Sequence, residues 1–508
     1  MQKLLNNFQL FNTIKNLKKT KKKIVLCHGV FDLLHIGHLK HFQKAKTFGD
    51  ILIVSLTKDK NINKGFGRPY FNESLRAELI SSLSIIDYVY LAEGTDALDI
   101  ILKVKPDVYC KGSEYKNKNK DLTNNIIKEV RLVKKFGGKI EFSDDITFSS
   151  SQILNKNSEL YNEKQKKFIN KISKNFSLSD IQNIFKKVFN LKLIIIGELI
   201  FDEYIFSEAV GKSAKEPVLI FKEEKSERYI GGVGSIVKNL SNFIDLKNIS
   251  LSTYFGEKKE FKKEFDRYIS NKIDKNYIYK KNSPTILKRR YVETVNKIKV
   301  FGLNQSNDEV LNLEQEKKVV HYLNKTLKKK DLVILIDYGH GFITKKISSL
   351  ICQKSKFLCL NAQVNSSNIG YQSIKNYKSV DCLVINEKEL RQELRDRTSD
   401  TKKLTKKLSF KYKLKRVLVT MGSDGTLFYD NKKNKFYECP AFANIIIDKV
   451  GAGDTLFSIF SILMKSNIDV NLSLLISSIA ASLNIKDFAN KNIIFPNQIL
   501  KIISHMIK

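Results

Sequence analysis

The sequence predicts an α/β protein with two consecutive domains. Three observations lead to this prediction. At 508 residues the chain is too long for one typical hydrophobic core. Short apolar runs typical of buried strands alternate with segments of helical periodicity, which indicates sheets covered by helices. A polar, lysine-rich stretch at residues 156–189 interrupts this alternation once.

The first domain is predicted at residues 23–155, after a short amphipathic lead-in at 1–22. Its alternating strands and helices indicate a parallel sheet with helices on both faces. In such sheets the ligand lies beyond the carboxyl ends of the strands. We therefore expect a site directly after the first strand. The predicted strands are 23–29, 50–56, 87–92, 106–112 and 139–145.

The second domain is predicted at residues 190–508. The stretch at 156–189 has a helical pattern, and we interpret it as a linker followed by a helix that begins this domain. A new series of apolar runs then starts, and an apolar helix at 451–464 closes it. The runs are 191–206, 331–339, 356–362, 381–389 and 416–430.

The charge balance raises the question of nucleic-acid binding, because 89 basic and 53 acidic residues give a net charge of +36. The lysines are spread along the whole chain, without an aromatic-basic signature or zinc-finger spacing. We therefore predict a basic surface and no specific nucleic-acid partner. A basic nucleic-acid-binding protein stays as an alternative, which salt-dependent DNA binding without nucleotide turnover would favour.

The pattern of the cysteines and the hydropathy of the chain indicate the cellular compartment of the protein. The six cysteines are scattered without a CxxC pair, which predicts reduced, buried thiols. The first residues lack the continuous apolar core of a signal peptide. No uninterrupted apolar stretch is long enough to span a membrane. We therefore expect a cytoplasmic protein.

A histidine cluster follows the first predicted strand. His28, His35, His38 and His41 all lie within "CHGVFDLLHIGHLKHFQKAK" at residues 27–46. Such a cluster could bind a metal, sit in a core or contact phosphate. A zinc site would need further ligands at suitable spacing. We predict no structural zinc in this four-histidine cluster, because the motifs that follow it in the chain are typical of phosphate-binding loops.

The spacing of His35 and His38 favours phosphate chemistry. They are three residues apart at the start of a predicted helix, so their side chains project from one face. Gly37 between them lets a substrate approach the backbone closely. The helix N-terminus favours a polyphosphate, and two imidazoles can hydrogen-bond an α-phosphate while negative charge builds in the transition state.

Further motifs follow in order: KGFGRP at 64–69, RAELI at 76–80, KPDVYCKGSEY at 105–115 and FSSSQI at 148–153. This ordered set resembles the cytidylyltransferase-like nucleotidyltransferases, which have a Rossmann-like fold, and most closely the adenylyltransferase half of the bifunctional heptose-phosphate enzymes. The resemblance implies that His35 and His38 stabilise the reacting phosphate. It implies nucleotide contacts for Gly29, Phe31, Asp32, Gly37, Lys46, Arg76, Ser149, Ser150 and Ser151, and substrate contacts for Lys111 and Glu114.

A second glycine-rich motif, DKVGAGDTLFS, opens the helix near residue 452. Successive backbone N–H groups of a Gly-Ala-Gly turn can hold an anion, with the helix dipole behind them. Asp454 at the start of the helix can take a proton from a sugar hydroxyl that attacks ATP. The alternative is an ordinary N-capped helix after a glycine turn.

Four other motifs place this turn in context: GELIFDEY at 197–204, GGVGS at 231–235, INEKE at 385–389 and VTMGSDG at 419–425. Together they resemble the ribokinase-like sugar kinases, and the segments at 216–218 and 284–292 resemble the heptose kinases in particular. The resemblance implies that Asp454 is the catalytic base. It implies an anion hole at Gly451, Ala452 and Gly453, sugar contacts at Asp202, Gly231 and Gly232, Mg²⁺ near Asn386 and Glu389, and ATP contacts at Thr420, Gly422 and Gly425.

The sequence departs from the kinase pattern at a few positions. Ser235 replaces the asparagine of the family's Gly-Gly-x-x-Asn. Asn361, Ala362 and Gln363 stand where the heptose kinases have Asp-Pro-Lys. These departures bear on which sugar the kinase binds more than on the phosphoryl transfer itself.

The two resemblances together imply a bifunctional enzyme of nucleotide-sugar synthesis. A kinase acting on an anomeric hydroxyl yields the sugar 1-phosphate that a nucleotidyltransferase would activate, giving an ADP-heptose-like product. The order of the domains is the reverse of that in the heptose enzymes. The implied substrates are a sugar phosphate, ATP for the kinase, and ATP or CTP for the transferase, with Mg²⁺ as cofactor; a homo-oligomer stays open. An alternative is a transferase for glycerol phosphate or another alcohol phosphate, fused to an unrelated kinase.

Overall fold

The computed structural model describes residues 3–62, 68–94, 96–113, 125–143, 161–364, 373–443, 446–488 and 491–507. The chain divides into two compact units, the first formed by Met1–Ile169 with Leu500–Lys508 and the second by Asn170–Ile499. Each unit is an α/β body, as the sequence predicts. Within the described ranges, no helix combines the length and the apolar character needed to cross a membrane.

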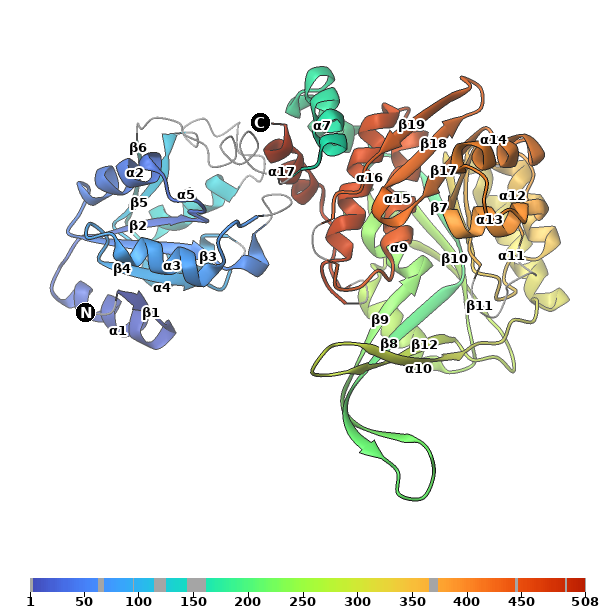
Figure 1. The fold of residues 1–508 in the computed structure, drawn as a ribbon, viewed down its shortest axis with the longest axis horizontal. Helices are drawn as coiled ribbons and strands as arrows, with labels where there is room; N and C mark the ends of the chain where they lie inside the picture. The colour runs from blue at the N-terminus through green and yellow to red at the C-terminus, as the bar shows by residue number, and fades with distance from the viewer. Residues whose placement is uncertain are drawn as a thin grey trace. The chain divides into compact units, whose positions relative to one another are not determined.

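The first unit is built on a six-stranded parallel sheet with the strand order β1-β4-β3-β2-β5-β6 (Figure 1). The strand order reverses between β2 and β5, and in open α/β sheets ligands bind at such a point. The strands are β1 (Leu4–Leu5), β2 (Ile24–Gly29), β3 (Ile51–Thr57), β4 (Tyr88–Ala92), β5 (Val108–Gly112) and β6 (Lys139–Ser143). The helices are α1 (Asn7–Lys19), α2 (Ile36–Lys46), α3 (Glu73–Ser82), α4 (Leu98–Val104) and α5 (Asn125–Lys135).

Both faces of this sheet are buried, which explains why its strands are continuous apolar runs. Successive residues of β2 point to opposite faces. Leu26 belongs to the core that includes Ile100 of α4, whereas Cys27 belongs to the core that includes Phe42 of α2. Strand β2 therefore places Cys27 under α2, the helix that contains His38 and His41 and has His35 as its N-cap.

The segment expected as a lead-in at 1–22 contributes a strand and a helix to the first unit. β1 pairs in parallel with β4, and α1 buries Leu10 and Ile14. The side chain of Asn6 caps α1 and forms a capping box with Gln9. The amphipathic pattern of this segment thus reflects packing onto the unit.

The second unit is built on a nine-stranded sheet with the order β11-β10-β7-β14-β15-β16-β17-β18-β19. It is parallel from β11 to β17, and β18 and β19 add an antiparallel edge. The strands are β7 (Leu193–Gly197), β10 (Ile249–Phe255), β11 (Asp274–Tyr279), β14 (Leu332–Asp337), β15 (Leu358–Ala362), β16 (Cys382–Asn386), β17 (Arg416–Thr420), β18 (Thr426–Asp430) and β19 (Lys435–Cys439).

Helices flank the sheets and also occupy the stretch expected as a linker. There, α7 (Glu163–Asn175) is followed by α8 (Leu178–Phe189), which a capping box at Ser177 begins. The remaining helices are α9 (Val233–Leu240), α10 (Lys259–Tyr268), α11 (Leu313–Thr326), α12 (Lys345–Lys354), α13 (Glu387–Leu394), α14 (Thr401–Lys411), α15 (Ala452–Lys465), α16 (Val470–Asn484) and α17 (Pro496–Met506).

A second, four-stranded sheet in this unit has the order β13-β12-β8-β9. Its strands are β8 (Leu199–Lys212), β9 (Leu219–Gly232), β12 (Ile286–Glu293) and β13 (Lys299–Gln305). The ends of β8 and β9 form a long hairpin that extends away from the rest of the unit (Figure 1). The run at 191–206, expected as one strand, is divided at Glu198 between the two sheets.

Candidate active sites

The histidine motif of the first unit lies at the N-terminus of α2. His35 is the N-cap residue, and its Nδ1 accepts a hydrogen bond from the backbone N–H of Gly37 at 3.1 Å. The proton of the neutral ring is therefore on Nε2, which can donate to a phosphate. The rings of His35 and His38 stack with their centroids 3.9 Å apart. Burial lowers the pKa of His35, so its ring is neutral at pH 7.

The other two histidines of the cluster have different partners. Nδ1 of His28 lies 3.1 Å from the hydroxyl of Ser55, and burial, with Lys111 nearby, lowers the pKa of His28 to about 3. Nδ1 of His41 lies 2.8 Å from the hydroxyl of Ser143. The sequence cluster is therefore three features: the stacked pair, a neutral histidine on β2, and His41 one turn further along α2.

Gly29 ends β2, and Phe31 and Asp32 lie in the turn that leads from it to α2. Phe31 has a positive φ of 47°, and a Cβ on Gly29 would lie 3.0 Å from the Phe31 ring. The buried carboxylate of Asp32 accepts hydrogen bonds from the N–H groups of Tyr70 and Phe71, at 2.8 and 3.1 Å. Asp32 therefore holds the segment before α3 against this turn.

The resemblance implies that Arg76 contacts the nucleotide, but the structure gives its side chain other partners. Its guanidinium is fully buried and donates to the carbonyls of Val30 and Thr57, at 2.7 and 2.9 Å, and to the carboxylate of Asp59 at 2.5 Å. It also donates to the carbonyl of Phe71 at 3.0 Å. Arg76 braces the loops after β2 and β3, and this placement corrects the expected phosphate contact.

Lys46 also does not lie where the resemblance implies a nucleotide contact. It is the last residue of α2, and its ammonium contacts the carboxylate of Asp87 and the carbonyl of Asp50, which precede β4 and β3. Ten residues of helix, at 1.5 Å each, separate it from the N-terminus of α2. Lys46 therefore lies at the amino edge of the sheet, away from the stacked histidines.

Lys111 lies at the carboxyl end of β5, beside the point where the strand order reverses. Its ammonium forms a salt bridge of 2.9 Å with the buried carboxylate of Glu129. Of the remaining expected contacts in this unit, Glu114, Ser149, Ser150 and Ser151 lie outside the described residues.

The second unit contains a cavity of about 290 Å³ at the carboxyl ends of its parallel strands. Eight of the residues expected at the kinase site line it together. They are Asp202, Gly232, Asn386, Glu389, Thr420, Gly451, Gly453 and the expected base, Asp454. Among the described residues, Gly231, Gly422, Gly425 and Ala452 do not form part of this lining.

Asp454 lies in the first turn of α15, and its two carboxylate oxygens have separate donors. The amide of Gln363 donates to Oδ1 at 2.9 Å, and the hydroxyl of Tyr338 donates to Oδ2 at 3.0 Å. Burial raises the pKa of Asp454 to about 6, although both hydrogen bonds oppose this shift. A carboxylate with such a pKa is matched to proton transfer near neutral pH.

The four-stranded sheet supplies the opposite side of the cavity. Asp202 of β8 forms an ion pair with Arg290 of β12 at 2.5 Å, and Lys288 of β12 lines the cavity as well. A Cβ on Gly231 would lie 2.3 Å from a carboxylate oxygen of Asp202, so only glycine permits this close approach. Burial lowers the pKa of Lys288. Charges of both signs thus face the cavity.

Asn386 and Glu389 are held by their helix. Asn386 is the N-cap of α13 and forms a capping box with Glu389. The carboxylate of Glu389 accepts from the N–H of Asn386 at 3.0 Å and from that of Val364 at 3.1 Å. Burial raises the pKa of Glu389, and the nearby charge of Asp454 acts in the same direction. Two carboxyl groups therefore face the same space.

The glycine turn before α15 has the geometry of an anion site. Gly451 is its N-cap residue with a positive φ of 79°, and a Cβ on Gly453 would meet open space. The carboxylate of Asp448, which precedes the turn, accepts from Tyr204 at 2.5 Å and from Lys299 at 2.6 Å. These bonds fix the segment that leads into the turn.

Sequence reasoning gave no site role to several residues that line this cavity. Tyr338 directly follows β14. Because ligands bind beyond the carboxyl ends of parallel strands, this position could have indicated a site residue. Lys288 and Arg290 alternate along β12 and share a face. Gln363 was noted as a departure, but its bond to Asp454 depends on the tertiary fold. Lys449 completes the basic side chains of the lining.

Comparisons with known proteins agree with both units. Residues 190–489, more than half of the chain, match the pfkB family carbohydrate kinases, and residues 26–156 match the cytidylyltransferase-like family. Fold and site define a carbohydrate kinase joined to a nucleotidyltransferase-like domain. The chain belongs to the pfkB family.

The curated relatives that match the chain include several named bifunctional protein HldE. That of Campylobacter concisus is 41% identical over 124 residues, which are 24% of this chain and 26% of the relative. That of Helicobacter pylori strain J99 is 38% identical over 152 residues, which are 30% of this chain and 31% of the relative. That of Geobacter metallireducens is 36% identical over 167 residues, or 32% of each. The matched segments span less than a third of these relatives.

Solved structures also align with the chain. Ribokinase from Arabidopsis thaliana, complexed with ribose and ATP, is 16% identical with a TM-score of 0.48, over 62% of this chain and 99% of that one. Phosphofructokinase-2 from Escherichia coli, in complex with potassium, is 12% identical with a TM-score of 0.49, over 63% and 99%.

Proposed function

We propose that this chain is a bifunctional enzyme of nucleotide-sugar synthesis. Residues 190–508 transfer the γ-phosphoryl group of ATP to the anomeric hydroxyl of a sugar or sugar phosphate and release ADP. Residues 23–155 transfer a nucleotidyl group from an NTP to a sugar 1-phosphate, which gives an NDP-sugar and pyrophosphate. The relatives named HldE support an ADP-heptose-like product. Because ATP is consumed, we place both reactions in the cytoplasm.

One observation carries the kinase proposal, namely the position of Asp454 in the cavity. Its carboxylate accepts the proton of the sugar hydroxyl as the oxygen attacks phosphorus. Gln363 and Tyr338 orient it through the two hydrogen bonds described above. The N–H groups of the Gly451–Gly453 turn face the charge that develops on the phosphate. Asp202 and Gly232 are the proposed sugar contacts.

The nucleotide of the kinase lies along the carboxyl ends of β16 and β17 in this proposal. Thr420 lines the cavity at the end of β17. Mg²⁺ fits the site because Glu389 and Asp454 bring two carboxyl groups to one space, whose mutual repulsion a cation would relieve. Glu389 and Asn386 would hold it, and it would neutralise charge on the ATP phosphates.

In the transferase, a phosphate oxygen of the sugar 1-phosphate attacks the α-phosphorus of the NTP, and pyrophosphate leaves. No protein nucleophile is needed. The stacked His35 and His38 at the N-terminus of α2 donate hydrogen bonds to the α-phosphate as negative charge builds. Lys111 at the end of β5 is the proposed contact for the sugar 1-phosphate.

Two assays test the proposal on the full chain. The first measures ADP release from ATP over a panel of sugars and sugar phosphates. The second measures pyrophosphate release over a panel of NTPs with sugar 1-phosphates and with glycerol 3-phosphate. We expect a sugar in the first and a sugar 1-phosphate in the second. Pyrophosphate release with glycerol 3-phosphate alone would favour the alcohol-phosphate alternative, and no turnover in either assay would contradict both.

A further inference from the structure

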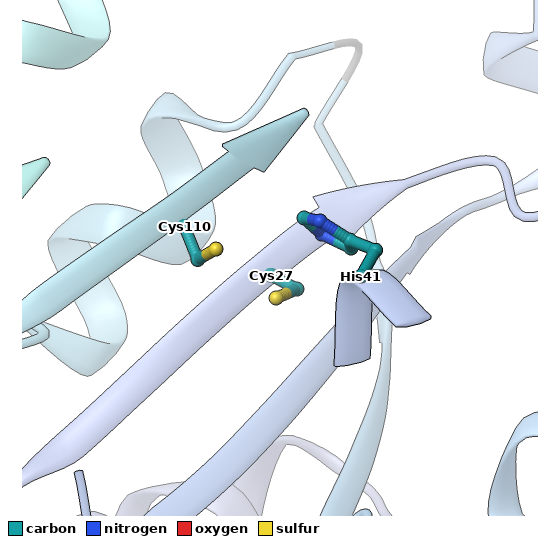
Figure 2. A group of neighbouring side chains, drawn as sticks. All are labelled: Cys27, His41 and Cys110. Atoms are coloured by element: carbon teal, nitrogen blue, oxygen red, sulfur yellow. The ribbon is translucent and has the colours of Figure 1, made fainter. Parts of the chain in front are cut away.

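Three side chains able to bind a metal converge in the first unit, next to the stacked histidines. Cys27 of β2, Cys110 of β5 and His41 of α2 each offer a ligand atom, and these atoms lie within 4.8 Å of one another. Figure 2 shows the two thiols on neighbouring strands, with the His41 ring directed toward them from the helix. Both cysteines are buried.

The fold brings these residues together by strand register and helix packing. Cys27 and Cys110 are directly paired in the parallel β2–β5 ladder, so their side chains point to the same face of the sheet. Helix α2 packs on that face through Phe42, whose side chain is fully buried. His41 precedes Phe42, and this places its ring beside the thiols.

We propose that Cys27, His41 and Cys110 bind one thiophilic divalent cation of the zinc class. Two thiolates and one imidazole are a ligand set that Zn²⁺ takes in proteins, with water or another group in the fourth position. Binding replaces the two S–H protons by two metal–sulfur bonds and releases both protons, so no electron is transferred. The proposal does not depend on either proposed activity.

The surroundings of the trio match those of metal sites. A metal-bound histidine usually has its other ring nitrogen hydrogen-bonded to an oxygen that fixes the ring orientation. The hydroxyl of Ser143, 2.8 Å from Nδ1 of His41, is such a partner. The stacked ring of Phe31, with its centroid 6.3 Å from that of His41, covers the histidine on another side.

A second cysteine pair in the chain provides a contrast. Cys359 and Cys382 are also buried and directly paired in a parallel ladder, that of β15 and β16. Among the described residues, only the Cys27 pair has a third ligand within reach. The prediction from sequence excluded zinc for the four histidines taken together. The structure instead combines one of them with two cysteines that are 83 positions apart in the chain.

A cation at this position would tie α2 to the two strands between which the strand order reverses. His41 lies one helical turn after His38, so the tie would hold the helix whose N-terminus carries the stacked pair. The cation would therefore hold the structure around the stacked histidines in place and would not itself take part in nucleotidyl transfer.

The first test measures zinc in the full chain after expression with added zinc and purification without chelators under reducing conditions. We expect about one zinc ion per chain by elemental mass spectrometry. The double variant Cys27→Ser/Cys110→Ser should lose it, whereas the matched Cys359→Ser/Cys382→Ser variant should keep it. A zinc-free parent protein, or equal loss from both double variants, would overturn the proposal.

A second test needs no cysteine variant and so does not depend on how such variants fold. Cobalt(II) added to the metal-free parent chain should produce a thiolate-to-cobalt charge-transfer band. Ser143→Ala, which removes the partner of His41, should weaken zinc binding by about 10–100-fold. No charge-transfer band while both thiols titrate as reduced would overturn the proposal, as would a disulfide between Cys27 and Cys110 in the purified protein.

Discussion

The side-chain amide of Gln363 donates a hydrogen bond to Oδ1 of Asp454 over 2.9 Å. The same amide donates to the side-chain oxygen of Asn361 at 2.8 Å, and Asn361 in turn donates to the carbonyl of Val384. Gln363, one of the neutral residues noted as departures from the heptose-kinase pattern, thus contacts the proposed base directly, and Asn361 contacts Gln363. We propose that Gln363 orients the carboxylate of Asp454.

The pKa of Asp454 predicts an acid limit for the kinase. Only the deprotonated carboxylate accepts a proton, and burial raises its pKa to about 6. Activity should therefore be full above this pH and fall about tenfold per pH unit below it. The measurement is kcat against pH by ADP release. A profile that stays flat well below pH 6 would show that Asp454 is not the titrating base.

Gln363→Leu should move this acid limit upward. The amide hydrogen bond stabilises the charged carboxylate and so lowers the pKa of Asp454. Its removal raises that pKa, and the acid limb of the kcat profile shifts to higher pH. Gln353→Leu, at an exposed position of α12, is the matched control and should leave the profile unchanged. A lower kcat without a shifted limb would indicate only a packing role for Gln363.

His38→Ala should abolish nucleotidyl transfer and leave the kinase active. The variant removes one of the two stacked rings at the N-terminus of α2. Loss of one transition-state hydrogen bond of this kind costs about 10²–10³ in rate. Pyrophosphate release measures the loss, and His321→Ala, at an exposed position of α11, is the control. Equal loss of both activities would argue against two separate sites.

Glu198→Gln should make stability less dependent on pH. Glu198 is fully buried between β7 and β8, and burial, with Asp337 nearby, raises its pKa from 4.5 to about 8. The folded state therefore binds more protons between these two values, and the free energy of unfolding falls as pH rises through them.

Urea unfolding of the full chain at about pH 5 and about pH 8, followed by circular dichroism, measures this slope. The parent protein should lose stability at the higher pH, and Glu198→Gln should lose less. Glu208→Gln, at an exposed position of β8, should behave like the parent. Identical slopes for all three proteins would mean that Glu198 is ionised in the folded state.

The fold was largely predictable because its central strands are apolar runs bounded by glycine or polar residues. Strand β2, which contains His28, and strand β14, which directly precedes Tyr338, both lie within the predicted ranges. The four-stranded sheet was not predicted. Half of the residues of β9 and all of those of β13 are exposed, and their sequences are polar or mixed, so they lack the pattern of a buried strand.

The sites were less predictable, since local sequence does not show where a side chain ends up. Lys46 is separated from the stacked histidines by the length of α2. The guanidinium of Arg76 is buried and donates to the carbonyls of Val30 and Thr57, a placement that the spacing of residues in the sequence does not indicate. Cys27 and Cys110 meet only because β2 and β5 pair in register. Each of these placements depends on strand order, which the sequence pattern leaves open.

Asp454→Asn tests the central claim most directly. An amide cannot accept the proton of the sugar hydroxyl, and general-base removal costs about 10²–10⁴-fold. The N–H groups of the Gly451–Gly453 turn remain, so ATP affinity measured by calorimetry should change little. We expect this variant to lose sugar phosphorylation while it releases pyrophosphate from NTP and preformed sugar 1-phosphate at the parent rate. Phosphorylation at the parent rate would show that Asp454 is only part of a helix cap, and would contradict the account.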